Sequence, residues 1–148
     1  MVILAAIDEP QGSNPVISVA HDLASAYETN LHVVHVSSEA DFKSRQKSVS
    51  DIDDFREYSK AQARESTANM ARKAVDETLD GDFNNEIVTV GRVGDPVQSI
   101  LDVAADIDAE YIVIGGQKRS PTGKALFGST TQSILLTADR PVVTVMKD

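Results

Sequence analysis

The residues best suited to chemistry are cations set among glycines near the end of the chain. Lys118, Arg119 and Lys124 lie in the stretch from Tyr111 to Ala138, which contains no Asp or Glu although the chain has a net charge of −9. The same stretch contains glycines and hydroxyl side chains: Gly115, Gly116, Gly128, Ser129, Thr130 and Thr131. Glycines let a backbone approach an anion closely, and the amides that begin a helix point toward it. The stretch therefore predicts an anion-binding site.

Two predicted elements position this stretch. The apolar run Tyr111–Ile114 predicts a buried strand that leads into the basic loop. The hydroxyl residues Ser129–Thr131 predict the start of a final helix. Ser129 is better explained as the cap of this helix, or as a cap that also binds phosphate, than as a nucleophile, because no histidine is placed to activate it.

The rest of the chain alternates apolar runs with amphipathic segments. Strands are predicted at 2–7, 31–36, 86–90, 111–114 and 141–146, and helices at about 14–28, about 52–79, from Asp95–Pro96 onward and at about 130–138. This alternation predicts an α/β fold, a doubly wound Rossmann-like three-layer sandwich with a five-stranded parallel sheet, in one domain spanning residues 1–148. Ligands of such sheets bind at the carboxyl ends of the strands, near the point where the strand order reverses.

Composition excludes several classes of protein. A sequence pI near 4.7 disfavours nucleic acid or an anionic membrane as the main partner, because both would be repelled. The absence of cysteine removes disulfides and thiolate chemistry, and it fits a cytoplasmic location. No apolar run is long enough to cross a membrane. The surface is acidic, which suits a salty cytoplasm.

No metal site is expected from the remaining ionisable residues. His32 and His35 lie three apart on a predicted strand, so their side chains point to opposite faces and do not share one metal. Asp51, Asp53 and Asp54 begin a predicted helix, where the helix dipole accounts for them. The long polar stretch at 37–51 has no clear period, and its role is open.

Two common phosphate-binding motifs do not fit the basic loop. A Walker loop would need glycine at position 118 and Ser or Thr at position 125, where the chain has Lys118 and Ala125. A dinucleotide fingerprint would need three spaced glycines after the first strand, where Gly12 stands alone. Both readings are set aside.

The loop resembles the signature of the universal stress protein family. ATP-binding members carry a glycine, two residues, a second glycine, nine residues, and a third glycine followed by Ser or Thr. Gly115, Gly128 and Ser129 match this pattern, whereas Lys118 stands at the middle glycine. The resemblance extends along the chain to Ile3–Asp8, Leu31–Val36, Gly94–Pro96 and Pro141–Val145.

The resemblance implies a nucleotide site. Ala6, Ile7 and Asp8 would border adenine and ribose, and Val36 would present backbone groups to the adenine edge. The glycines would lie close to ribose and phosphates, and the helix start would bind phosphate. Mg²⁺ would be held chiefly by the phosphates, with Asp8 as the protein candidate. The expected cofactor-binding residues are Ala6, Ile7, Asp8, Val36, Ile114, Gly115, Gly116, Gln117, Lys118, Arg119, Lys124, Gly128, Ser129, Thr130 and Thr131.

Three functions remain open for this chain. The first is an ATP-binding stress-response switch or carrier with at most slow hydrolysis, since neither a dedicated general base nor an arginine finger is placed for turnover. The second is a family member that does not bind ATP and acts as a dimeric protein-interaction module. The third is a binder of another phosphate-bearing ligand such as AMP. Flavin is disfavoured by the aromatic content of 5%. The last strand, at 142–146, is expected to pair two copies into a homodimer, and further protein partners are unknown.

Overall fold

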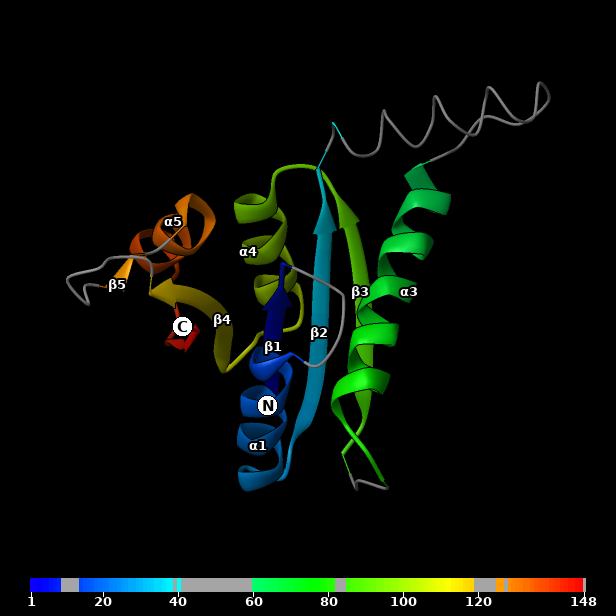
Figure 1. Cartoon of the computed structure of the whole chain (residues 1–148), viewed down its shortest axis with the longest axis vertical. Helices are drawn as coiled ribbons and strands as arrows, with labels where there is room; N and C mark the ends of the chain where they lie inside the picture. The colour runs from blue at the N-terminus through cyan, green and yellow to red at the C-terminus, as the bar shows by residue number, and fades with distance from the viewer. Residues whose placement is uncertain are drawn as a thin grey trace.

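A computed structural model of the chain describes residues 1–8, 14–38, 40, 60–81, 85–118, 125–126 and 128–147. Helices flank a sheet in this part of the chain (Figure 1). The elements are, in chain order, β1 (Val2–Ile7), α1 (Pro15–Ala26), β2 (Asn30–Ser37), α3 (Lys60–Thr78), β3 (Ile87–Val93), α4 (Pro96–Asp106), β4 (Tyr111–Lys118), β5 (Ala125–Leu126), α5 (Ser129–Thr137) and β6 (Val142–Lys147).

The sheet confirms the predicted fold class. In the part of the chain that the structure describes, five strands run parallel in the order β3-β2-β1-β4-β6, and the two-residue β5 pairs antiparallel with β4. The register is continuous along the long strands, with Ile3 opposite Leu31 and Ile112 opposite Val142. The chain thus forms the doubly wound α/β sandwich that the alternation of strands and helices predicts.

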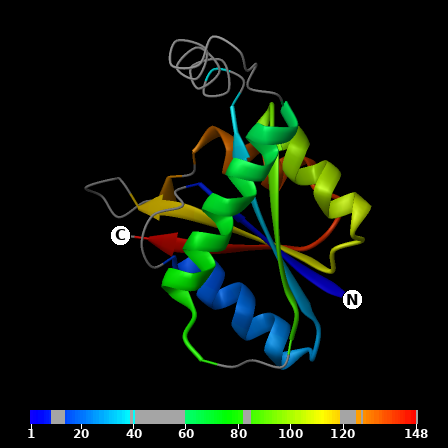
Figure 2. The same ribbon diagram turned by 90° about the vertical axis from the view of Figure 1, so that its right-hand side faces the viewer.

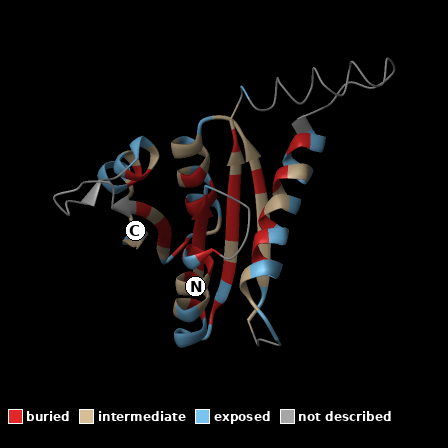
Figure 3. Ribbon diagram, in the orientation of Figure 1, coloured by how far each residue is buried: buried red, intermediate tan, exposed pale blue. Residues whose placement is uncertain are grey.

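Alternate residues of the central strands feed two separate cores. Ile3, Ala5 and Ile7 of β1 pack with α1 and α3 on one face, whereas Leu4 and Ala6 pack with α4 and α5 on the other. Figure 2 shows α1 and α3 together on one side of the sheet. The central strands are buried along most of their length (Figure 3). Burial on both faces explains why the apolar run of β1 is nearly continuous in the sequence.

Two helices begin as the sequence predicts. Asn14 caps α1 through Oδ1, which accepts the Val16 amide at 3.0 Å, and Pro15 occupies the first turn. Asp95 caps α4 in the same way, and Pro96 follows it. Proline fits the first helical position because its missing N–H has no partner there in any case.

One close contact fixes α3 against β3. A Cβ atom on Gly91 would collide with the backbone at Arg64 and Ala68 of α3. Only glycine lets the helix come this near the strand, so the position is constrained by packing.

The structure corrects the sequence predictions at two places near the basic loop. β4 continues to Lys118, so Gly115 to Lys118 form strand where a loop was expected to begin. The predicted cap Ser129 is wrong: Gly128 occupies the cap position, and Ser129 is the first residue of α5. The predicted start of the second long helix, near residue 52, lies outside the described residues, as does most of the polar stretch at 37–51; the helix is seen from Lys60 to Thr78.

Candidate functional site

Residues of four strands lie level at the carboxyl edge of the sheet. Ile7 of β1 pairs with His35 of β2, and Gly115 of β4 pairs with Val145 of β6. β1 pairs with β4 as far as Ala5 opposite Val113, so Ile7 and Gly115 each follow the last paired residue of their strand by two positions. The chain passes from β1 to β2 on one side, while β4 lies on the other side of β1. The strand order therefore reverses here, which is where sheets of this kind bind ligands.

A buried threonine joins α5 to the second half of β4. Thr131 donates its hydroxyl to the backbone oxygen of Gly115 at 2.8 Å and is itself almost fully buried. This bond holds the first turn of α5 beside the glycines of β4. Thr131, which the sequence predicts to bind phosphate, thus uses its hydroxyl hydrogen within the protein.

Gly128 is the exposed cap residue of α5. It has φ −64° and ψ 165°, a conformation that any residue adopts, and it makes no side-chain cap hydrogen bond. A Cβ atom on Gly128 would meet nothing within 4 Å. Neither backbone strain nor a neighbouring atom of the described protein explains glycine at this position. Ser129 is exposed and Thr130 half-buried in the same turn.

Gly115 differs from Gly128 because a protein neighbour limits it. A Cβ atom there would lie 3.3 Å from Cγ2 of Val16, in the first turn of α1. A side chain would therefore press α1 away from the sheet. The glycine keeps the start of α1 close to the carboxyl end of β4.

The end of β1 is fixed by a histidine that the sequence left unassigned. His35 is buried, and its Nδ1 lies 3.0 Å from the backbone oxygen of Ile7. Since a carbonyl oxygen only accepts, Nδ1 carries the proton in this bond. The bond holds the last residue of β1 in place, directly before the exposed Asp8. The only sign of this role in the sequence is that His35 is a polar residue inside an apolar strand. Periodicity predicts that such a residue is packed or exposed, and it does not identify a hydrogen-bond partner.

The other predicted residues of β1, β2 and β4 lie in the same neighbourhood. Ala6 and Ile114 are buried on the face that carries α4 and α5, and Val36 packs partly buried on this face too. The strand after Val36 is secured where Gly94 donates its amide to the backbone oxygen of Ser37 at 2.9 Å. Gly94 has φ +139°, which favours glycine.

The cationic residues are placed only in part. Lys118 ends β4 and pairs with Ala125 of β5, so its backbone is extended and carries none of the strain that a left-handed glycine position would impose on lysine. Gly116 and Gln117 belong to the same strand. Arg119 and Lys124 lie outside the described residues. Within the described part of the chain, no cluster of three metal-ligating side chains occurs.

These elements match a known family over nearly their whole length. The family model described as the universal stress protein family matches residues 1–146. The chain belongs to this family. A universal stress protein from Mycolicibacterium smegmatis is 41% identical over 51 residues, which are 34% of this chain and 39% of that protein. The chain thus matches well under half of the length of this curated relative.

Solved structures agree on the fold. A universal stress protein from Archaeoglobus fulgidus is 27% identical, with 97% of each chain covered and a TM-score of 0.58. A universal stress protein from the same organism in complex with dAMP is 20% identical, with coverage of 97% and 96% and a TM-score of 0.55. A universal stress protein in complex with cAMP is 15% identical, with coverage of 100% and 98% and a TM-score of 0.57. Among the described residues of this universal stress protein, no helix is both long and apolar enough to span a bilayer.

Proposed function

We propose that this chain binds a nucleotide, ATP with Mg²⁺, at the carboxyl edge of β1 and β4. It acts there as a switch or carrier with at most slow hydrolysis. The observation that carries the proposal is Gly128: this position has glycine, yet the described protein around it leaves room for a side chain. A bound phosphate that approaches the backbone supplies the missing reason for glycine.

The first turn of α5 offers the donors for that phosphate. Gly128 has no side chain to cap the helix, so the cap residue itself leaves the first amides of α5 without a side-chain acceptor. Thr131 holds this turn beside Gly115 of β4. The phosphate donors in this proposal are the first amides of α5 and the exposed Ser129 hydroxyl, together with the charge of Lys118 at the end of β4. The start of α5 and the end of β4 lie at the same edge of the sheet. We include Arg119 and Lys124 among the phosphate-binding residues because of their positions in the sequence, since both lie outside the described residues.

The nucleoside end of the ligand belongs at β1 and β2. Ile7 is held by His35, and Asp8 follows it, exposed and able to accept ribose hydroxyls. Val36 lies on the neighbouring strand, where its backbone groups would meet the base. The two relatives solved with dAMP and cAMP carry adenine nucleotides, which supports an adenine base in this chain as well.

A monophosphate such as AMP is the second candidate ligand. Both nucleotides named for the solved relatives carry one phosphorus atom. The Thr131 hydroxyl already donates its hydrogen to the backbone oxygen of Gly115, so a triphosphate has fewer hydroxyl donors than the sequence predicts. Comparison of ATP with AMP on the same protein decides between them.

The protein also acts as a homodimer in this proposal, paired through residues 142–146. β6 is an edge of the described sheet, and its apolar side chains from Val142 to Met146 are only partly buried. Leu136 in the preceding α5 is 80% exposed. An unpaired apolar edge strand favours pairing with a second copy.

The test is calorimetric titration of the purified protein with ATP·Mg²⁺ and, separately, with AMP. We expect the natural protein to bind and Gly128→Ala to bind about tenfold or more weakly, because a methyl group that obstructs one hydrogen bond to phosphate costs about 1.4 kcal/mol or more. Thr137→Ala, at the far end of α5, is the control and should bind like the natural protein. Thermal melts check that the variants fold.

Lys118→Gly separates the remaining outcomes. Weaker binding of ATP by this variant means that the lysine charge holds phosphate. AMP binding as tight as ATP·Mg²⁺ binding favours the monophosphate ligand. No binding by the natural protein, with binding gained by Lys118→Gly, would refute the proposal and assign the chain to members that act through protein partners alone.

A further inference from the structure

Two tyrosines far apart in the sequence form a stacked pair. The ring centroids of Tyr27 and Tyr111 are 5.8 Å apart, with an angle of 26° between the ring planes. Their hydroxyl oxygens lie 3.3 Å apart, close enough for one to donate to the other. The edges of both rings that carry the hydroxyls therefore lie side by side.

The backbone holds each ring in this position. Tyr27 is the residue that caps the end of α1, and its amide donates to the backbone oxygen of Leu23 at 3.0 Å. Tyr111 begins β4, opposite Ile3 of β1. The next residue, Ile112, donates its amide to the backbone oxygen of Pro141 at 3.0 Å. Both side chains thus extend from backbone that is hydrogen-bonded within the fold.

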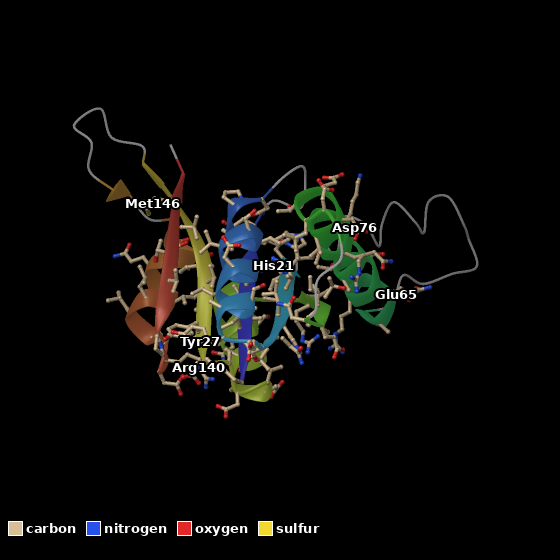
Figure 4. All side chains as sticks on the ribbon, turned by 90° about the horizontal axis from the view of Figure 1, so that it is seen from below. His21, Tyr27, Glu65, Asp76, Arg140 and Met146 are labelled. Carbon is tan, nitrogen blue, oxygen red and sulfur yellow. The ribbon has the colours of Figure 1, made fainter. Side chains whose placement is uncertain are left out.

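The pair is accessible, and it is separate from the candidate nucleotide site. Tyr27 is 48% exposed. Figure 4 shows Tyr27 at one end of the molecule and Met146, which pairs with Gly116 of the candidate site, toward the other. A small reagent in solution can therefore reach the rings without entering the candidate site.

Composition directs oxidation to tyrosine. The chain has no Cys and no Trp, three Tyr and three Met. Methionine takes up oxygen from two-electron oxidants to give sulfoxide. One-electron oxidants act on aromatic phenols when neither thiol nor indole is present, and two of the three phenols in this chain are in contact with one another.

We propose that Tyr27 and Tyr111 are a modification site at which one-electron oxidants, such as the hydroxyl radical, join the two rings by a carbon–carbon bond. Each phenol gives up one electron and one proton, so that two hydroxyl radicals become two water molecules. The two phenoxyl radicals couple between their Cε carbons. The hydrogen on each of these carbons then moves to the phenolic oxygen as a proton, which restores both aromatic rings and both hydroxyls. The net change is the loss of two hydrogen atoms.

The hydrogen bond between the rings holds the two hydroxyl-bearing edges together before oxidation. It raises the pKa of Tyr111 above its ordinary value, together with the nearby Tyr27 phenol, burial and Glu110. Each proton goes to the hydroxyl radical together with its electron, so the step needs no protein base. The radicals form in contact, so coupling competes well with their escape by other reactions.

The product would tie the end of α1 to the start of β4. The two residues are 84 positions apart in sequence, so the bond closes a long loop in the unfolded chain. A cross-link of this kind stabilises mainly by reducing the freedom of the unfolded state. The oxidised protein would be more resistant to unfolding than the reduced one, which is a useful response in a stress protein.

The experiment exposes the purified chain to light-generated ruthenium(III) tris-bipyridine with persulfate, which removes single electrons. We expect dityrosine fluorescence, a monomer mass lower by two hydrogen atoms, and a cross-linked peptide that contains Tyr27 and Tyr111. Tyr27→Phe and Tyr111→Phe each keep the ring and should each abolish the intrachain link. Tyr58→Phe is the matched control and should leave its yield unchanged. The oxidised natural protein should melt at a higher temperature.

A denatured sample tests whether the folded geometry is responsible. In urea the rings separate, so the intrachain link between Tyr27 and Tyr111 should be lost. The proposal is overturned if this link forms equally well in urea, if the links all involve Tyr58, or if dityrosine joins only separate chains, seen as dimers on a denaturing gel.

Discussion

Single side chains decide how the edge of the sheet is held. His35 donates to the backbone oxygen of Ile7, and Thr131 donates to that of Gly115, so each fixes a strand end next to the candidate site. A buried hydrogen bond contributes about 1 kcal/mol net, and leaving its partner unsatisfied costs more. His35 and Thr131 therefore stabilise the strand ends beside the candidate site, a role that their positions in apolar segments do not indicate.

His32 makes stability depend on pH. Its Nδ1 is buried with no hydrogen-bond partner among the described residues. Burial lowers the pKa of His32 from its ordinary value of 6.5, and the charge of Glu86 partly opposes this. The unfolded chain then takes up a proton near pH 6.5 that the folded chain binds only at lower pH. Its contribution to stability is therefore present above pH 6.5 and decreases as the pH falls toward the lower folded pKa.

Replacing His32 with Gln removes this titration. We expect the free energy of unfolding of the natural protein to fall more steeply between about pH 7 and about pH 5 than that of His32→Gln. Urea unfolding at several pH values measures both slopes, and carboxyl groups contribute equally to the two proteins. Equal slopes would show that His32 has the same pKa in the folded and unfolded chains.

At the scale of elements, the two edge strands are not alike. β3 and β6 both end the parallel part of the sheet, among the strands that the structure describes. Ile112 donates to the backbone oxygen of Pro141, and Leu31 to that of Glu86. Because alternate residues of a parallel strand bond to the same neighbour, the amides of Thr144 in β6 and Thr89 in β3 both point away from the sheet. The two threonines thus form a matched pair for testing which edge assembles.

Proline at these positions removes an outward amide donor. If β6 pairs the two copies, Thr144→Pro removes one hydrogen-bond donor from each chain at the interface. The loss of association free energy should be about 1–3 kcal/mol, which weakens the dimer about tenfold or more. Thr89→Pro should leave the dimer intact. Sedimentation equilibrium of both variants measures this, and circular dichroism checks their folding. A natural protein that is monomeric at micromolar concentration, or one that dissociates only with Thr89→Pro, would exclude β6 as the interface.

At the scale of the whole molecule, charge opposes compactness. The chain carries a net charge of −9 at pH 7, so its surface repels itself. Salt at about 0.1 M shortens the range of this repulsion to about 10 Å, and higher salt shortens it further. Screening should therefore stabilise the folded chain.

Thermal melts in increasing NaCl test this effect. We expect Tm to rise by roughly 2–4 °C, equivalent to about 1 kcal/mol, as NaCl increases from low to about 0.5 M. Sodium sulfate at equal ionic strength separates screening from the exclusion of salt from the surface. A Tm that stays constant or falls in NaCl would mean that local ion pairs, such as Lys73 with Glu77, outweigh the net repulsion.

The order of strands and helices, the cap at Asp95 and the family could all be predicted from the amino-acid sequence. These features depend on periodicity, local chemistry and glycine spacing. All three are patterns among residues close together in the sequence. The extension of β4 to Lys118 could not be predicted in this way, because it depends on pairing with β6 and β5. The same holds for the bond between His35 and Ile7 and for the contact between Tyr27 and Tyr111. Each joins segments far apart in sequence, and no local pattern specifies which distant backbone or ring a side chain will meet.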